Sequence, residues 1–325
     1  MRYDHSTLGE ICHFIDYRGK TPEKTTSGIP LITAKIIKNG FIQPPEEFIA
    51  TDAYDKWMRR GIPKRGSVIM TTEAPLGEVA RIDSDDKLAF AQRIIILEPD
   101  KTKLDSQYLY YAMRDSVLMG RIKERATGTT VTGIKAAELR EVIIDYPSLK
   151  TQRQIAEMVG HIDQKIQNNT RINDNLYEMA SVLYASLFGN PALQITTVGK
   201  YSEQIYSGGT PSTSKPEYWG GGLHWFSSGE TRSRFAITTE KTITNAGVDN
   251  SSTKLAHKFD IVMASAGQGF TRGQTTMLLL DTYVNQSVIV IHADRLHLPY
   301  LFWNLANRYE ELRQCTSTSQ CTGIT

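Results

Sequence analysis

The sequence has few cysteines and no long apolar run, and these two shortages exclude several classes of protein. Its 325 residues include only three cysteines, Cys12, Cys315 and Cys321, and none of them forms a CxxC pair. This disfavours a disulfide-stapled domain, a structural zinc site and a c-type haem. No apolar stretch approaches the ~18 residues needed to span a bilayer, and the N-terminal segment lacks the apolar core of a secretory signal. We therefore expect a cytoplasmic protein with no membrane partner.

An excess of one charge is also absent. Lysine and arginine number 37 against 35 aspartates and glutamates, which gives a net charge of +2. That balance neither demands nor excludes nucleic acid, because binding depends on where the charges lie. The length exceeds the roughly 100 to 200 residues of an ordinary domain, so we expect two domains.

A long-period repeat is present. Matching blocks are "GKTP" at 19–22 and "GGTP" at 208–211, "GSVIMTTEA" at 66–74 and "FDIVMASAG" at 259–267, "FAQRIII" at 90–96 and "VNQSVIV" at 284–290, and "YLYYAM" at 108–113 and "YLFWNL" at 300–305. Their offsets are nearly constant, between 189 and 194 residues. "TGI" at 132–134 recurs at 322–324, where the continuation seen in the first copy is missing. The sequence thus predicts one complete unit followed by most of a second.

Each copy combines strand and helix patterns. Short Ile- and Val-rich runs such as "GSVIM" and "QSVIVIHAD" lie between Gly and Pro residues and predict strands. The stretches 106–124 and 298–312 have aromatic and aliphatic residues three and four apart, which predicts helices packed on those strands. The expected fold class is α+β, with two repeated domains at 1–147 and 191–325 joined by a long coiled-coil-type helix at 148–190.

The predicted long helix carries a heptad seam. A capping-box start is expected at Thr151 with Gln154, and a stop at 189–191. The seam positions step by four and three residues, and they are Ile155, Val159, Ile162, Ile166, Asn169, Asn173, Leu176, Ala180, Leu183 and Leu187. Such a seam requires a partner helix, and the two asparagines would fix its register. The alternative is a helix packed on its own domain.

No catalytic or metal-binding motif is found. HExxH, phosphate-loop and nucleophile motifs are absent, and the seven histidines are scattered. Gly267, Gly269 and Gly273 follow a strand pattern, but their spacing is GxGxxxG and a strand pattern comes next, which disfavours a dinucleotide site. Glu73 resembles a catalytic carboxylate in a turn, but the matching residue of the second copy is Ala266. We expect no catalytic residues, no metal and no cofactor in this chain.

Polar and basic side chains instead suggest contacts with DNA. Lys56, Arg59, Arg60, Lys64 and Arg65 surround Trp57 and could clamp phosphates, although a solvated charged loop fits the same residues. Gln92 with Arg93 and Gln286 with Ser287 stand at matching repeat positions, and Gln and Arg side chains can read adenine and guanine. The remaining candidates lie in turn-rich segments: Arg18, Lys20, Thr21, Thr129, Thr130, Ser207, Thr210, Lys215, Gln268 and Arg272.

These features together resemble a known family. The two α+β copies that begin "LGE…GKTP" and "VGK…GGTP", the "TGIK…ELREVIIDYPSLKTQRQIAEMV" segment and the long helix are similar to the specificity subunit of type I restriction-modification systems. The resemblance implies two target recognition domains that each read half of a split double-stranded DNA sequence, and two conserved helices that pair antiparallel as a spacer. It also implies that modification and restriction subunits dock on the chain and bring S-adenosylmethionine, ATP and Mg with their chemistry.

One departure from the family pattern affects the helix. The continuation that would supply the second conserved helix does not follow the second "TGI". The exposed seam then predicts self-association through the first helix, or cover by a modification subunit. Two other functions stay open from the sequence: a coiled-coil adaptor that does not bind DNA, and a fragment of a fused restriction-modification enzyme.

Overall fold

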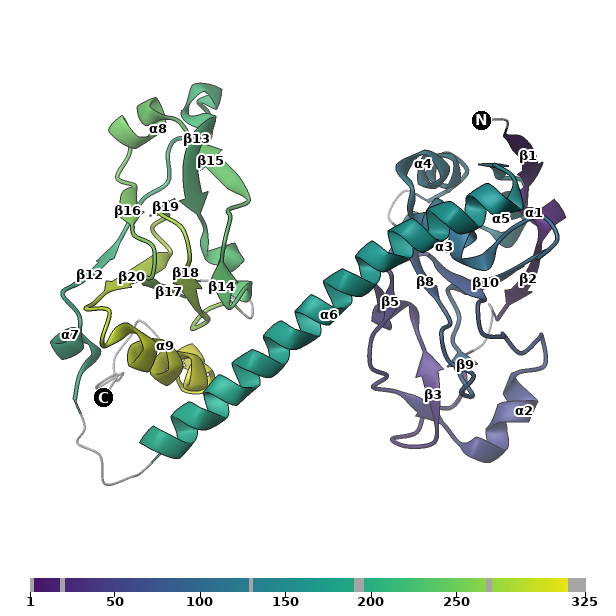
Figure 1. Cartoon of the computed structure of the whole chain (residues 1–325), viewed down its shortest axis with the longest axis horizontal. Helices are drawn as coiled ribbons and strands as arrows, with labels where there is room; N and C mark the ends of the chain where they lie inside the picture. Colours follow the sequence, from purple (N-terminus) through teal and green to yellow (C-terminus); the bar gives the residue numbers. More distant parts are fainter. Residues whose placement is uncertain (1–2, 18–20, 129–130, 190–195, 267–270, 315–325) are drawn as a thin grey trace. The chain divides into compact units, whose positions relative to one another are not determined.

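The computed structural model describes residues 3–17, 21–128, 131–189, 196–266 and 271–314 (Figure 1). The chain forms two compact units, 1–170 and 171–325. Their boundary falls inside the helix α6, Leu149–Phe188, which is drawn in Figure 1 as one uninterrupted ribbon. The domain limits expected from the sequence stay a prediction.

The first unit begins with a run of short strands. Its strands are β1 (Asp4–Thr7), β2 (Cys12–Asp16), β3 (Ile29–Ile32), β4 (Ile37–Lys38), β5 (Phe41–Ile42), β6 (Phe48–Ile49), β7 (Val68–Thr72), β8 (Leu76–Arg81), β9 (Ala89–Phe90), β10 (Ile94–Pro99) and β11 (Ile143–Tyr146). Its helices before α6 are α1 (Leu8–Ile11), α2 (Tyr54–Trp57), α3 (Ser106–Arg114), α4 (Ser116–Glu124) and α5 (Ala136–Arg140), with short 3-10 turns at Ala34–Ile36 and Thr51–Ala53.

A four-stranded antiparallel sheet in the order β2-β10-β7-β8 forms the centre of this unit. It is buried on both faces because successive side chains alternate between two cores. Ile95 and Leu97 join the core under α3 and α4, whereas Ile94 and Ile96 join the core under β3 and β9. The continuous run of isoleucines at 94–96 is therefore the expected sequence of a strand covered on both sides.

The second unit contains a related set of elements. Its strands are β12 (Gln204–Ser207), β13 (Trp219–Phe226), β14 (Phe235–Ala236), β15 (Lys241–Ile243), β16 (Lys254–Ala256), β17 (Ile261–Ala264), β18 (Thr275–Leu278), β19 (Thr282–Val284) and β20 (Val288–His292). Its helices after α6 are α7 (Val198–Tyr201), α8 (Asn245–Asp249), α9 (Leu298–Asn307) and α10 (Tyr309–Gln314), with 3-10 turns at Pro216–Tyr218 and Ser228–Arg232.

The strand order of the second unit repeats that of the first. Its central sheet runs β12-β20-β17-β18-β14, so the first four strands match β2-β10-β7-β8. A parallel pair also recurs: Ile32 of β3 lies beside Phe90 of β9, and Phe226 of β13 lies beside Val284 of β19. Both partners are shifted by 194 residues, in agreement with the sequence repeat. The predicted fold class, two repeated α+β domains joined by a long helix, is confirmed.

Helix α6 packs on each unit through a different part of its length. In the first unit the fully buried Gln152 accepts a hydrogen bond from the Asp105 N–H (2.8 Å) and donates to the carbonyls of Lys103 and Pro147 (2.9 and 2.8 Å). In the second unit Tyr184 of α6 accepts a hydrogen bond from Asn304 of α9 (3.0 Å). Ordered contacts thus tie each half of the helix to its own unit.

The start of α6 differs from the prediction. The helix begins at Leu149, and the Ser148 hydroxyl accepts a hydrogen bond from the Thr151 N–H at 3.4 Å. Thr151 is therefore inside the first turn, and the predicted capping box of Thr151 and Gln154 is wrong. Serine and threonine are both favoured at the N-cap, so the sequence alone does not decide between Ser148 and Thr151. The end at Phe188 agrees with the predicted stop.

Candidate nucleic-acid interface

Three segments of the first unit meet at one end of its central sheet. The turn between β7 and β8 contains Glu73, and the turn between β9 and β10 contains Gln92 and Arg93. The third segment contains Gly133, which forms an antiparallel backbone bridge with Glu73. Together they line a cavity of about 330 Å³ that also includes Lys135. The structure therefore brings Gln92 and Arg93 into one polar hollow with residues that are distant in the sequence.

The matching turn of the second unit shares one backbone hydrogen bond with the first. The Arg93 carbonyl accepts a hydrogen bond from the Thr72 N–H (2.9 Å), and the Ser287 carbonyl accepts one from the Ser265 N–H (2.9 Å). The side chains differ, however. Gln286 is held by the hydroxyl of Thr210, which donates to its Oε1 at 2.5 Å. Two loops that are 76 residues apart in the sequence thus place two predicted DNA-contact residues against each other.

The basic stretch after α2 is exposed, but some of its charges have partners. Lys56, Arg59 and Lys64 are exposed. Arg60 donates to the Asp16 carbonyl at 2.6 Å, and Arg65 lies 3.6 Å from Asp85. A surface ion pair of this kind is weak, but it lowers the charge available for phosphate. The exposed charges of this stretch are consistent with phosphate contacts.

The Trp57 ring at the centre of this stretch has a structural role. Its indole N–H donates to the Phe90 carbonyl at 3.0 Å. The ring also stacks on Tyr17, with 6.2 Å between the centroids. Trp57 therefore anchors the basic stretch to the underlying core.

The remaining candidates are dispersed. Thr21 and Ser207 are exposed. Lys215 donates to the Tyr218 hydroxyl at 3.1 Å, a hydrogen bond that raises the pKa of its ammonium group and keeps it charged. Arg272 is partly buried and donates to the carbonyl of Arg313 at 2.7 Å, so it connects its turn to α10. The predictions for Arg18, Lys20, Thr129, Thr130 and Gln268 lie outside the described residues.

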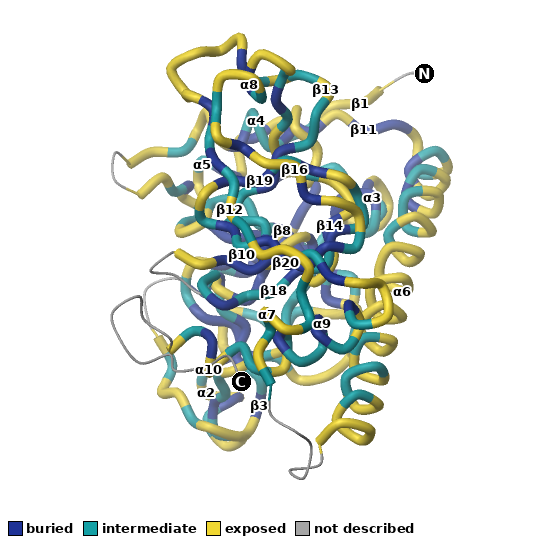
Figure 2. The backbone as a smooth tube through the Cα atoms, turned by 90° about the vertical axis from the view of Figure 1, so that its left-hand side faces the viewer, coloured by how far each residue is buried: buried dark blue, intermediate teal, exposed yellow. Residues whose placement is uncertain are grey.

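The predicted helix seam is largely uncovered. Ile155 is partly buried against the first core and Val159 is half-buried, so the alternative of packing on the chain's own domain holds at this end. Beyond them Ile162, Ile166 and Leu176 are 57–58% exposed. Leu183 and Leu187 are similarly exposed, and Asn169 and Asn173 are exposed as well. Figure 2 shows the resulting exposed stretches along α6.

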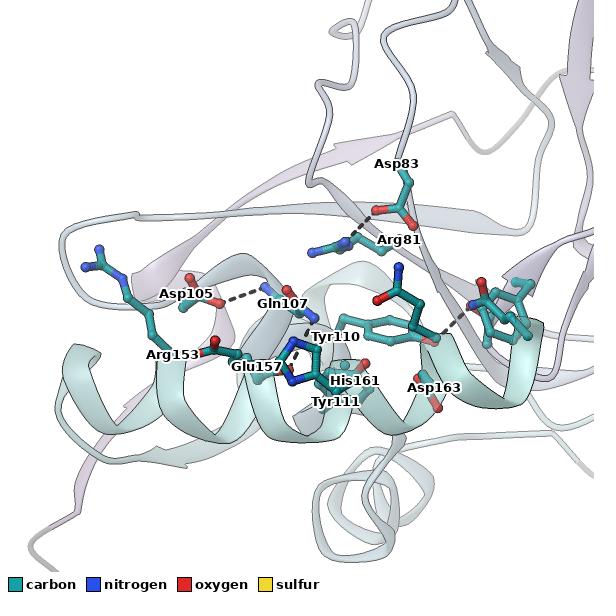
Figure 3. Close-up of a pocket in the computed structure, with 16 residues that line it drawn as sticks. Arg81, Asp83, Asp105, Gln107, Tyr110, Tyr111, Arg153, Glu157, His161 and Asp163 are labelled. Carbon is teal, nitrogen blue, oxygen red and sulfur yellow. Dashed lines mark hydrogen bonds and ion pairs between the residues drawn. The ribbon is translucent and has the colours of Figure 1, made fainter. Parts of the chain in front are cut away.

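A second cavity of the first unit lies against α6 and has a volume of about 520 Å³ (Figure 3). Arg153, Glu157 and His161 of α6 line it, and the figure places Arg81 with Asp83 opposite them. Arg81 and Asp83 form an ion pair at 2.6 Å. None of the residues that we proposed for DNA contact lies here. Gln107 at this cavity donates to the Ala156 carbonyl of α6 at 3.2 Å, and Arg114 lies 3.3 Å from Asp163 of α6, so polar contacts here hold α6 on its domain.

Among the described residues, no group of three or more His, Cys, Asp or Glu side chains is arranged to hold a metal ion. Over the same residues, no helix combines the length and apolar character needed to span a membrane.

Glu73 is the residue of this interface that the sequence did not reveal. Its carboxylate lies 2.9 Å from Nε of Arg93. The sequence suggests Glu73 only as a catalytic group, and Ala266 at the matching position of the second copy argues against that role. Glu73 directly follows one predicted strand and Arg93 directly precedes another, but no rule of sequence spacing links the two positions.

Comparisons with known proteins show which family the chain is similar to. The family model for the type I restriction modification DNA specificity domain matches residues 2–178, just over half of the chain. Over 184 residues the chain is 30% identical to the type I restriction enzyme MjaIX specificity subunit of Methanocaldococcus jannaschii, a match that covers 56% of this chain and 42% of the relative. Over 130 residues it is 24% identical to the type I restriction enzyme HindI specificity subunit of Haemophilus influenzae, covering 38% and 28% respectively. The chain thus spans less than half the length of these curated relatives.

A solved structure shares the fold. The S subunit of a type I restriction-modification system from M. genitalium has a TM-score of 0.57 and 17% identity to this chain, and the match covers 96% of this chain and 78% of that one. At this identity the likeness concerns the fold alone. The family assignment rests on the match over residues 2–178, which includes the first unit with its turn cavity and the first 30 residues of α6. The chain belongs to the type I restriction modification DNA specificity domain family.

Proposed function

We propose that this chain is the DNA-recognition subunit of a type I restriction-modification complex and is itself not catalytic. The family match over residues 2–178 is the observation that carries this proposal. The relatives that it matches are specificity subunits. The fragment of a fused restriction-modification enzyme, which would require methylase or nuclease motifs, is not favoured.

The two units are proposed to read two different halves of one DNA target. They have the same central strand order and the same hydrogen bond between their paired turns. The side chains on that common frame differ: Gln92 and Arg93 in the first unit, Gln286 and Ser287 in the second. Because base identity is read by side chains in the grooves, different side chains on one frame imply different half-sites.

The proposed partners supply the chemistry. Modification subunits would bind this chain and perform S-adenosylmethionine-dependent adenine methylation, and restriction subunits would add cleavage that depends on ATP and Mg. The complex would act in the cytoplasm. This chain would contribute the positions on DNA at which the other subunits act.

A gel-shift assay tests the proposal. The purified chain should bind duplex DNA at low salt, and its affinity should fall steeply at moderate salt because phosphate contacts release counterions. A duplex selected by the chain from a random library should compete better than a scrambled duplex of equal length. A protein that binds neither duplex at low salt would be an adaptor, and the proposed function would be wrong.

Self-association is a second proposal, carried by the exposed seam of α6. The seam is symmetric about residue 171: Ile155 pairs by position with Leu187, Val159 with Leu183, Ile162 with Ala180, Ile166 with Leu176, and Asn169 with Asn173. Two antiparallel copies would therefore place apolar side chains against apolar ones and amide against amide. Each of these pairs joins an a position of one helix to a d position of the other, which is the layer pattern expected of an antiparallel coiled coil. A modification subunit that covers the same face is the competing occupant.

A further inference from the structure

An ion pair joins the two turns of the first unit that form the candidate interface. Arg93 Nε lies 2.9 Å from Glu73 Oε1, and the two side chains are 49% and 41% exposed. Of the described residues, only Glu73 is a partner of this guanidinium. A ligand can therefore contact both side chains, and the ion pair with Glu73 already orients the guanidinium of Arg93.

The backbone on both sides of the pair is unusual. Arg93 has φ of 74° and Ala74, next to Glu73, has φ of 48°. Positive φ costs roughly 1–2 kcal/mol for residues other than glycine. The Thr72 N–H donates to the Arg93 carbonyl, and the Glu73 bridge to Gly133 fixes the other turn. Arg93 therefore has a backbone conformation that its residue type does not favour, Glu73 precedes a residue in such a conformation, and hydrogen bonds hold both turns.

We infer that Glu73 is a positioning residue that orients Arg93 to read a guanine in the half-site bound by the first unit, an inference that rests on the proposed function. With Nε engaged by Glu73, the two terminal nitrogens of Arg93 keep the N–H groups that can donate to guanine O6 and N7. The carboxylate fixes the plane of this fork before DNA arrives. A fixed fork loses less conformational freedom on binding than a mobile one.

Charge explains why the ligand is a base and not a phosphate. An unpaired arginine is attracted to any phosphate, but the Glu73 carboxylate repels phosphate oxygens and offsets the positive charge of Arg93. A guanine edge carries no net charge, so this repulsion is absent. The second carboxylate oxygen of Glu73 can in addition accept from a cytosine amino group. The pair is therefore suited to a G·C base pair in the major groove.

The second unit provides an internal control. Ala266 and Ser287 occupy the positions that match Glu73 and Arg93, in a turn that shares the backbone hydrogen bond of the first unit but not the positive φ of Arg93. That unit has no ion pair at this place. Changes to Glu73 or Arg93 should alter the base preference of one half-site and leave the other half-site as it is.

The test selects binding sites from a random duplex library with the full chain, and it measures the salt dependence of binding to the selected site. In Arg93→Ala the preference for guanine at one position should fall by about 5- to 150-fold, the discrimination of one bidentate contact. Arg93→Lys should weaken the preference to a smaller extent, because lysine can still donate to guanine but lacks the planar fork, while it keeps the wild-type salt slope. In Glu73→Gln the guanine preference should also fall, and the salt slope should steepen by about 0.9 because Arg93 is released to a phosphate.

Arg59→Ala, in the exposed basic stretch, is the matched control and should weaken binding to all sequences alike. Thermal melting followed by circular dichroism checks that each variant is folded, and Arg93→Lys replaces Arg93→Ala if the alanine variant is not. Unchanged base preferences in Arg93→Lys and Glu73→Gln would overturn this inference and leave the proposed function intact. A wild-type chain that selects no sequence at all would overturn both.

Discussion

Ile166 lies near the middle of the α6 seam, and its truncation tests self-association directly. The side chain is 57% exposed in the single chain. Full burial of an isoleucine is worth about 1.5–3 kcal/mol, so covering the exposed part stabilises a dimer by roughly 1–1.7 kcal/mol per copy. A two-fold dimer contains this contact twice. Ile166→Ala should therefore weaken dimerisation by roughly 2–3 kcal/mol, or about 30- to 150-fold.

Sedimentation velocity of the purified chain over micromolar concentrations measures this change. Val182→Ala is the matched control, because Val182 is 68% exposed and lies on α6 outside the seam. Its truncation should leave the dimer unchanged. A wild-type chain that is monomeric at every concentration, or an Ile166→Ala variant that associates like wild type, would refute the reasoning.

The direction of the two helices can be read from disulfide cross-links in a background without native cysteines. A mixture of Ile162→Cys and Ala180→Cys chains should cross-link in the antiparallel arrangement, because these positions are related by the symmetry about residue 171. Neither variant alone should cross-link with itself. Efficient cross-linking of Ile162→Cys alone would show that the helices are parallel.

Three further predictions concern affinity, stability and reactivity. Replacing Lys56, Arg59 and Lys64 by Ala should lower the salt slope of DNA binding by about one per phosphate contact and leave base preferences unchanged in a selection assay; an unchanged slope would show that these side chains do not contact DNA. Gln152→Ala leaves the Asp105 N–H and two carbonyls without their partners, so the first unit should lose about 2–4 kcal/mol of stability in urea unfolding, and a loss below 1 kcal/mol would contradict this role. Burial raises the pKa of the Cys12 thiol from 9.0 to about 12, so its contribution to stability should be complete below pH 9 and lost as the pH rises toward 12. Alkylation of Cys12 at pH 8 should require unfolding, and rapid alkylation of the folded chain would contradict its burial.

The sequence predicted the repeated design well because local patterns determine it. The strand patterns at 66–72 and 259–264 became β7 and β17, which occupy the same place in their sheets. The run "TTMLLL" formed the strand β18, Thr275–Leu278, as expected. Alternation of side chains between two cores leaves a signature that can be read without knowledge of the fold.

Features that depend on contacts between distant segments were not predicted. The ion pair of Glu73 with Arg93 exists because β7 and β10 are neighbours in the sheet, a fact that no local pattern contains. The same holds for the hydrogen bond between Arg272 and the Arg313 carbonyl, which connects the turn of Arg272 to α10. Residue type suggested which side chains could bind DNA, but only the folded chain shows which of them are already engaged.

Selection of binding sites from a random duplex library, performed with the wild-type chain alone and with the proposed modification subunits added, tests most directly whether the two units read DNA. If each unit reads one half of the target, the selected motif should be bipartite, with two short specified sequences separated by a gap of fixed length in which any base is accepted. Each half should respond to changes in only one unit: Arg93→Lys should alter one half and Gln286→Ala the other. Enrichment of a single contiguous motif, or of no motif at all, would contradict the claim that the two units read separate halves of one target.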